Sequence, residues 1–186
     1  MHCLKLEALV VPFARFWSLS FIVLVFDQAS KTWAGRFREA SAEVFEWEGF
    51  LRFGFTYVTN PGASFSMLSN YPEFLTCLAI AALLCIWSFR KALELERHQL
   101  QFIFGSIFGG IAGNLTDRLF RGGEVVDFID LTFQFIPSSN DILFAIRHFP
   151  VFNIADSAIF LGVVFYLIIG FTDARQAQSE SVATND

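Results

Sequence analysis

Four apolar stretches, each close to the length that a bilayer requires, limit what this chain can fold into. They run over about residues 13–33, 74–90, 100–120 and 151–171. A hydrocarbon core of about 30 Å needs about 20 apolar residues in a helix. The composition agrees, since 54% of the residues are hydrophobic and only 17% are charged, against about 25% charged in soluble domains. We therefore predict an α-helical membrane protein with four transmembrane helices.

The segments between these stretches predict a small structure outside the membrane. Residues 45–59 and 125–136 are rich in aromatic and β-branched residues, which favours extramembrane strands of a small β-sheet. A short amphipathic helix near residues 141–147 is expected to lie at the interface. Residues 1–171 then form a single integral-membrane domain, and the polar tail 172–186 is expected to be disordered.

Basic residues set the expected orientation. Arg90, Lys91 and Arg97 crowd the short loop between the second and third spans, although the total of Lys and Arg is nearly equal on the two sides. Cytoplasmic loops carry an excess of these residues. We therefore expect this loop and both termini in the cytoplasm, with the two longer loops outside.

Several kinds of chemistry are not indicated. The three cysteines form no CxxC and have no histidine pair at ligand spacing, so the sequence predicts no zinc site. No serine or cysteine has plausible His and acid partners for a nucleophilic triad. The formal charge is −5 and no long basic run is present, so nucleic acid is not an expected partner. We predict no cofactor and no metal.

Polar residues gather at the span ends that share one membrane face. In chain order they are Asp27 and Lys31, Asn60 and Gly62, Asn114, Asp117 and Arg118, and Asn153 and Asp156. Within each helix they lie three or four residues apart, which places them on one helix face. The pattern predicts one polar pocket at that face of the membrane.

Some of these residues also have a purely structural interpretation. Asp27 and Lys31 most simply form an intrahelical ion pair that fixes the end of the first span. Asn60 begins an Asn-Pro-Gly sequence that is typical of a turn. Arg118 is equally compatible with an interfacial anchor and with a contact to a lipid phosphate.

Asp156 is harder to explain without a function. A carboxylate at mid-span costs about 2.5–3.5 kcal/mol on insertion scales, less near an interface, and usually marks a functional site. Two aspartates in a partly dry site share a proton, and such a pair can activate water and protonate a leaving amine. A proton relay in a transporter also uses membrane carboxylates. The inner halves of the spans are almost purely apolar, which favours a site open to one face.

Five motifs resemble those of lipoprotein signal peptidase, the bacterial membrane aspartyl peptidase also called signal peptidase II. They are DxxxK at 27–31, NPGASF at 60–65, GNLTDR at 113–118, VVDF at 125–128 and FNIAD at 152–156. They occur in the family's order and spacing, and the resemblance covers nearly the whole chain.

The resemblance implies a function and a location. It makes Asp127 and Asp156 the catalytic aspartates, which would cleave prolipoproteins just before the cysteine that carries a diacylglyceryl group. It implies a multi-pass protein of the bacterial cytoplasmic (inner) membrane with its active site at the outer, periplasmic face. The expected partners are these precursors and membrane lipids, and we expect a monomer.

The resemblance also implies roles for the surrounding residues. Asn60, Gly62, Asn114, Asp117, Arg118 and Asn153 correspond to positions that shape the pocket and bind substrate. Residues 45–59 resemble an extramembrane sheet that cradles the substrate, and residues 141–147 resemble a lid.

Overall fold

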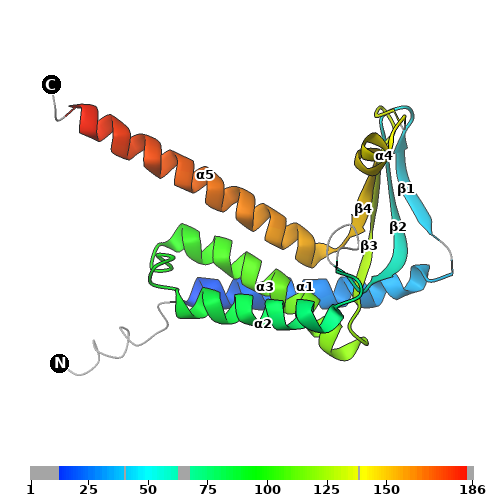
Figure 1. The fold of residues 1–186 in the computed structure, drawn as a ribbon, viewed down its shortest axis with the longest axis horizontal. Coiled ribbons are helices and arrows are strands. Elements are labelled where there is room, and N and C mark those ends of the chain that lie inside the picture. Colours follow the sequence, from blue (N-terminus) through cyan, green and yellow to red (C-terminus); the bar gives the residue numbers. More distant parts are fainter. Residues whose placement is uncertain (1–12, 40, 63–67, 138, 184–186) are drawn as a thin grey trace.

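A sheet stands at one end of a group of helices in the computed structural model of the chain, which describes residues 13–39, 41–62, 68–137 and 139–183 (Figure 1). The helices are α1 (Ala14–Ala34), α2 (Pro72–Ser88), α3 (His98–Phe120), α4 (Asp141–Arg147) and α5 (Ile154–Ala183), with a short 3-10 helix η2 (Gly35–Phe37) after α1. The strands are β1 (Ala42–Trp47), β2 (Leu51–Asn60), β3 (Val125–Phe133) and β4 (His148–Phe152).

Helix α3 is the centre of the helical group and packs against α1, α2 and α5. A row of small residues makes these contacts close. A Cβ added at Gly105 or Gly109 would lie 2.7 or 2.6 Å from a carbonyl oxygen of α1, and one at Gly110 would lie 2.5 Å from the carbonyl oxygen of Ala155 on α5. Only glycine permits these backbones to approach so closely, as is common between membrane helices.

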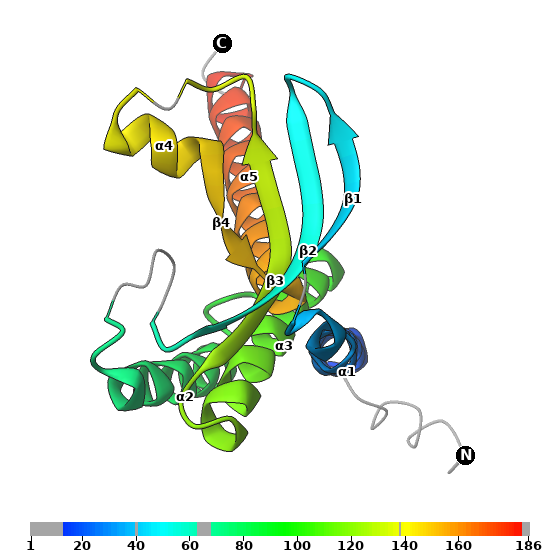
Figure 2. The same ribbon diagram turned by 90° about the vertical axis from the view of Figure 1, so that its right-hand side faces the viewer.

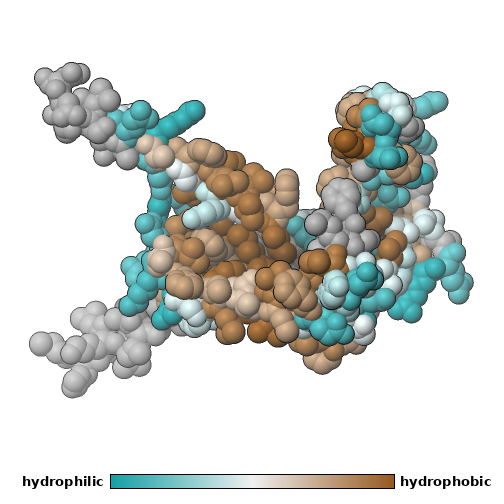
Figure 3. All heavy atoms as spheres, in the orientation of Figure 1, coloured by the Kyte–Doolittle hydropathy of each residue, from teal (hydrophilic) through white to brown (hydrophobic). Residues whose placement is uncertain are grey.

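The outer surface of the helices is apolar. Large side chains such as Phe21, Phe26 and Phe171 are exposed, and apolar residues cover the side of the helical group that faces the viewer in Figure 3. In the part of the chain that the structure describes, Ile154–Gln176 is the one helix long and apolar enough to cross a membrane, and Pro72–Ser88 is a shorter apolar helix. An apolar surface of this extent is stable against lipid rather than water.

The sheet is antiparallel throughout, in the order β1-β2-β3-β4. Figure 2 shows it rising from the end of the helical group. The β2–β3 register pairs Val58 with Asp127 and Asn60 with Val125. The end of β2 and the start of β3 therefore lie side by side, and β2 contacts α1 while β3 contacts both α1 and α3. The predicted small β-sheet is therefore present, with the 45–59 segment divided into two strands.

The structure differs from the sequence prediction at the start of the last span. Residues 148–152 form β4, which pairs with β3, and the helix begins at Ile154 rather than near residue 151. Aromatic and β-branched side chains favour the strand. Asn153 and Asp156 then form the helix cap described below, which the apolar run alone did not reveal.

The polar tail also differs, because α5 continues to Ala183 where disorder was expected. Residues 172–183 contain no glycine or proline and include three alanines and two glutamines, which are good helix formers. An ion pair of 2.7 Å joins Asp173, at the start of this extension, to Arg97, the residue just before α3. A polar composition therefore did not prevent the preceding helix from continuing.

Candidate active site

Lys31 lies at the centre of a buried ionic cluster where α1 meets α3. Its Nζ is 2.9 Å from Asp27 Oδ2 on the same helix and 2.9 Å from Asp117 Oδ2 on α3, and it donates to Asn114 Oδ1 at 2.9 Å. The side chains of Lys31, Asp27 and Asp117 have no solvent exposure. The expected Asp27–Lys31 pair is therefore one part of a larger network.

Asp117 is surrounded by two cations and two hydrogen-bond donors in this cluster. Besides Lys31, it forms an ion pair with Arg121 Nη1 at 3.0 Å, and it accepts from Gln28 Nε2 at 2.8 Å and from the backbone N–H of Val126 at 3.0 Å. Two cations thus balance the two carboxylates of the cluster. A fully buried charge is tolerated only when it is paired and hydrogen-bonded in this way.

Asp127 and Asp156 are held differently, by amide groups. Asn153 Nδ2 donates to Asp127 Oδ1 at 2.7 Å, and Asn60 Nδ2 donates to Asp127 Oδ2 at 3.2 Å. Asp156 Oδ1 accepts from Asn114 Nδ2 at 2.7 Å. Among the described residues, no lysine or arginine lies within ion-pair distance of either carboxylate.

The N-terminus of α5 explains how Asp156 is positioned. Asn153 Oδ1 accepts from the backbone N–H of Asp156 at 2.9 Å, and Asp156 Oδ2 accepts from the backbone N–H of Asn153 at 3.2 Å. This reciprocal pair is a capping box. Asp27 Oδ1 accepts from the N–H of Ala155 at 3.0 Å. The ionic cluster and the cap thus fix the first turn of α5 together.

Burial makes the carboxyl group of Asp127 a weaker acid than an ordinary aspartate. The residue is 4% exposed, and burial, followed by the nearby charge of Asp156, raises the pKa of Asp127 to about 7. The hydrogen bonds from Asn60 and Asn153 act in the opposite direction, as does the charge of Lys31. Near neutral pH, a proton is therefore available on one carboxylate of the pair.

A cavity of about 790 Å³ opens beside the two carboxylates. Its polar wall contains Asn60, Gly62, Asn114, Arg118, Asp127 and Asp156. The rest is mainly apolar and comes from β3, β4 and the first turns of α5, with Leu131, Phe149, Val151, Phe152, Ile159, Phe160, Leu161 and Val163. The cavity therefore suits a ligand that is polar at one end and apolar over most of its surface.

Arg118 supplies the positive group of the cavity. Its Nη2 donates to the carbonyl of Gly62 at 2.9 Å, and its Nε is buried with no partner among the described residues. The guanidinium interacts electrostatically with Asp156 and, less strongly, with Asp127. Arg118 can therefore bind a carbonyl or phosphate oxygen in the cavity while facing the carboxylates.

The structure brings together all ten residues that the sequence singled out, but in two groups. Asp117 and Asn153 do not line the cavity. Asp117 lies behind it in the ionic cluster, and Asn153 holds Asp127 in place. Of the predicted NPGASF motif, residues 63–65 lie outside the described residues.

Sequence reasoning missed two members of the cluster, Gln28 and Arg121. Gln28 adjoins Asp27, and Arg121 lies four residues after Asp117. That second spacing was the available signal, because it places a cation on the face of α3 that carries Asp117.

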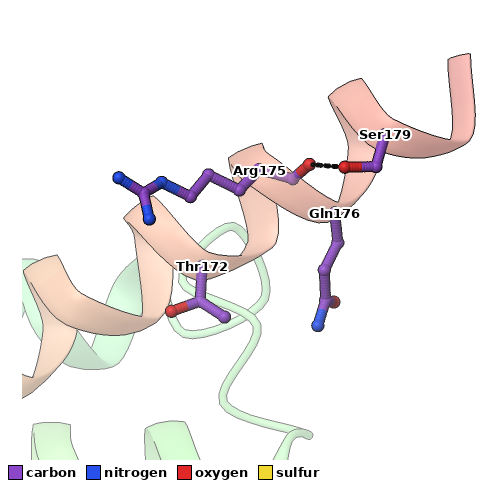
Figure 4. Close-up of a pocket in the computed structure, with 4 residues that line it drawn as sticks. All are labelled: Thr172, Arg175, Gln176 and Ser179. Carbon is purple, nitrogen blue, oxygen red and sulfur yellow. Dashed lines mark hydrogen bonds between the residues drawn. The ribbon is translucent and has the colours of Figure 1, made fainter. Parts of the chain in front are cut away.

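Neither a metal-binding group nor a hollow far along α5 provides a second site of this kind in the described residues. In the described part of the chain, no group of three His, Cys, Asp or Glu side chains is arranged to hold a metal ion. A shallow hollow lies far along α5 and is lined by Thr172, Arg175, Gln176 and Ser179 (Figure 4). Ser179 Oγ donates to the carbonyl of Arg175 at 3.0 Å. All four residues are exposed and come from one helix, so no groups converge there.

An apolar helical surface, and two hydrogen-bonded carboxylates beside a mainly apolar cavity, are typical of a membrane protein with a polar site among its helices. A family model for signal peptidase (SPase) II matches residues 19–172. The chain belongs to this family, which makes it a peptidase, and this confirms the resemblance seen in the sequence.

Similar proteins and structures agree with this membership. The chain is 38% identical to the lipoprotein signal peptidase of Nostoc punctiforme, over 84% of this chain and 89% of that protein. It is 36% identical to that of Shewanella sp. strain MR-4, over 86% and 89%. A solved structure described as a bacterial membrane enzyme superimposes with a TM-score of 0.66 at 28% identity, covering 84% of this chain and 87% of that one.

Proposed function

We propose that this protein is an aspartyl endopeptidase of the bacterial inner membrane that removes signal peptides from prolipoproteins. It cleaves just before the diacylglyceryl-modified cysteine, and Asp127 and Asp156 activate the attacking water. The relatives at 38% and 36% identity are named lipoprotein signal peptidases, which supports this substrate class.

One observation carries the proposal: the two carboxylates at the cavity have amide donors in place of cations. A cation at ion-pair distance favours the ionised form of a carboxylate, and among the described residues none lies at that distance from Asp127 or Asp156. The pKa of Asp127, about 7, lets this pair hold one proton and accept another near neutral pH. This is the requirement for general acid–base hydrolysis without a covalent intermediate.

The shape and lining of the cavity support a lipid-modified peptide as substrate. The polar wall accommodates a peptide bond, while Phe160, Leu161 and Val163 of α5 line the cavity on an apolar helix. Acyl chains attached next to the scissile bond can lie along this wall without leaving an apolar environment. Such a substrate gains binding energy from its lipid that an unmodified precursor lacks.

We also propose that α1, α2, α3 and α5 all cross the membrane, with both chain termini in the cytoplasm. The basic residues Arg90, Lys91 and Arg97 follow α2 and precede α3, at the end of the helical group away from the sheet (Figure 1). The positive-inside rule places that end in the cytoplasm. The sheet, which would cradle the substrate, and α4 then lie at the outer face with the active site. We further propose that the protein is a monomer and needs no cofactor.

The test uses two precursors that differ only in the lipid. Purified protein is incubated with a prolipoprotein bearing the diacylglyceryl cysteine, and separately with the same precursor unmodified. We expect cleavage before the cysteine in the first and no cleavage of the second. No cleavage of either precursor by folded protein contradicts the proposal and favours a binding or proton-coupled membrane protein.

A further inference from the structure

The orientation of the Asn114 amide is set by groups that can only donate. Its Oδ1 accepts from the Lys31 ammonium at 2.9 Å and from Asn153 Nδ2 at 3.2 Å. An ammonium has no acceptor, so turning the amide over would place its NH₂ against two donors. The Asn114 Nδ2 must therefore face Asp156 Oδ1, at 2.7 Å.

The two asparagines that face Asp127 are fixed in the same manner. Asn153 Oδ1 accepts from the backbone N–H of Asp156 at 2.9 Å, and Asn60 Oδ1 accepts from the backbone N–H of Gly62 at 2.9 Å. Their NH₂ groups consequently face Asp127, at 2.7 and 3.2 Å. Asp127 and Asp156 thus each receive two hydrogen bonds. The number of hydrogen bonds therefore does not tell which of the two aspartates is protonated.

The position of each carboxylate does distinguish them. Asp156 lies in the first turn of α5, where the helix N-terminus favours an anion, and its Oδ2 accepts from the N–H of Asn153. Arg118 interacts more strongly with Asp156 than with Asp127. Asp127 lies on a strand, has no helix terminus to stabilise its charge and is 4% exposed. The ionised form is therefore favoured on Asp156.

The charged groups around the pair come from two other elements. Lys31 and Asp27 face it from α1, and Asp117 and Arg118 face it from α3. Lys31 is the cation of this set that contacts a side chain hydrogen-bonded to Asp156. β2 contributes the neutral Asn60, and the cap residue after β4 is the neutral Asn153. Lys31 is therefore linked to Asp156 by two successive hydrogen bonds, through the side chain of Asn114.

We propose that Asp127 carries the resting proton and Asp156 stays ionised, and that Lys31 and Asn114 are positioning residues that fix this division. The inference rests on the proposed function and adds to it the role of each aspartate. The pKa of about 7 for Asp127 agrees with it.

The division defines where each proton goes. Water adds to the scissile carbonyl carbon and gives a proton to Asp156, while Asp127 gives its proton to the carbonyl oxygen, leaving a neutral diol. The carbon–nitrogen bond then breaks as Asp156 passes its proton to the amine nitrogen. A diol hydroxyl proton returns to Asp127. The products are a carboxylic acid and an amine, Asp127 is again protonated, and Asp156 is again ionised.

The test is the pH profile of kcat/KM for cleavage of the diacylglyceryl precursor by three variants. The acidic limb reports the group that must be ionised and the basic limb the group that must be protonated. Asn114→Ala removes a donor to Asp156, so we expect the acidic limb to move up by about one to two pH units while the basic limb stays. Lys31→Met frees the Asn114 amide to turn, and should move the acidic limb in the same direction.

Asn60→Ala is the matched control, because it removes one amide donor from Asp127 instead. It should move the basic limb up by about the same amount and leave the acidic limb. The opposite pattern reverses the assignment, and a loss of rate in which neither limb moves makes these residues purely structural. If Lys31→Met does not fold, the two asparagine variants decide. Failure of the wild-type protein to cleave the precursor rejects the proposed function itself.

Discussion

Two pairs of aspartates lie close together in this protein and are stabilised in opposite ways. Asp27 and Asp117 have no solvent exposure, and Lys31 and Arg121 neutralise them at 2.9–3.0 Å. Asp127 and Asp156 lie in contact with the same network, but among the described residues their donors are side-chain amides and a backbone N–H. The difference shows how one small region can hold both a rigid scaffold and a titratable site.

The charges of the buried cluster around Lys31 serve to position the other pair of aspartates. Asp27 accepts from the first turn of α5, and Lys31 holds the Asn114 that donates to Asp156. The neutralised pair therefore positions the pair that is not neutralised. Pre-organisation of this kind removes the need to reorganise polar groups during a reaction, and perturbed carboxylates gather at functional sites for the same reason.

The largest effect should come from neutralising either Asp127 or Asp156, the two carboxylates at the cavity. We expect Asp127→Asn and Asp156→Asn each to lower the rate of precursor cleavage by about 10²- to 10⁴-fold, the range of general acid–base catalysis, with the protein still folded. Asp130→Asn is the control, because Asp130 lies on the same strand but pairs with Arg52 at the surface. Cleavage retained by Asp127→Asn or Asp156→Asn contradicts the assignment.

Removing the cation of the other pair should act on stability. Lys31→Met leaves two buried carboxylates without their shared partner, and we expect the free energy of unfolding to fall by about 3–5 kcal/mol. Denaturation in detergent measures this change. Arg97→Met breaks two ion pairs between exposed side chains, with Glu94 and Asp173, and should change the same quantity far less. Equal losses from both variants would remove the distinction between buried and surface pairs.

A steric change should disturb the neutralised pair without removing a charge. A Cβ at Gly113 would lie 2.5 Å from Asp27 Oδ2, so Gly113→Ala should lower the free energy of unfolding by about 1–3 kcal/mol. Gly170 has no atom within 4 Å of the corresponding position. Gly170→Ala should therefore be neutral or stabilising, as alanine is the better helix former. A harmless Gly113→Ala would mean that α3 can move away from α1.

The smallest effect in stability should come from the cap that joins the two pairs. Asn153→Ala removes the α5 cap and should lower the free energy of unfolding by about 0.5–2 kcal/mol. Asn140→Ala is matched, because Asn140 Oδ1 accepts from the N–H of Leu143 at the start of α4. Only Asn153→Ala should also change the pH profile of cleavage, since Asn153 donates to Asp127. Identical pH profiles would show that Asn153 acts as a cap alone.

Much of this arrangement was predictable from spacing and hydropathy. The four apolar runs predicted four long helices, and the i, i+4 spacing of Asp27 and Lys31 predicted their ion pair. The common membrane face of the polar residues predicted that they would meet. The resemblance to signal peptidase II singled out Asp127, which no periodicity did.

The remainder depended on contacts between distant parts of the chain. The division of the aspartates into two pairs follows from how α1, α3 and α5 pack, so Asp117 was expected at the pocket but lies behind it. The bridge that Gln28 makes to Asp117 joins residues 89 positions apart. The extent of α5 was missed because a polar composition is compatible with both a disordered tail and an exposed helix.

The direct test of the comparison is the titration of the individual carboxyl groups. In protein labelled with ¹³C at the aspartate carboxyl carbons, the signal that is absent from Asp127→Asn belongs to Asp127. We predict that this signal titrates with a midpoint near the pKa of about 7, and that the midpoint falls in Asp156→Asn because a neighbouring negative charge is lost. A midpoint near the ordinary aspartate value of about 3.9, unchanged in Asp156→Asn, would contradict the account.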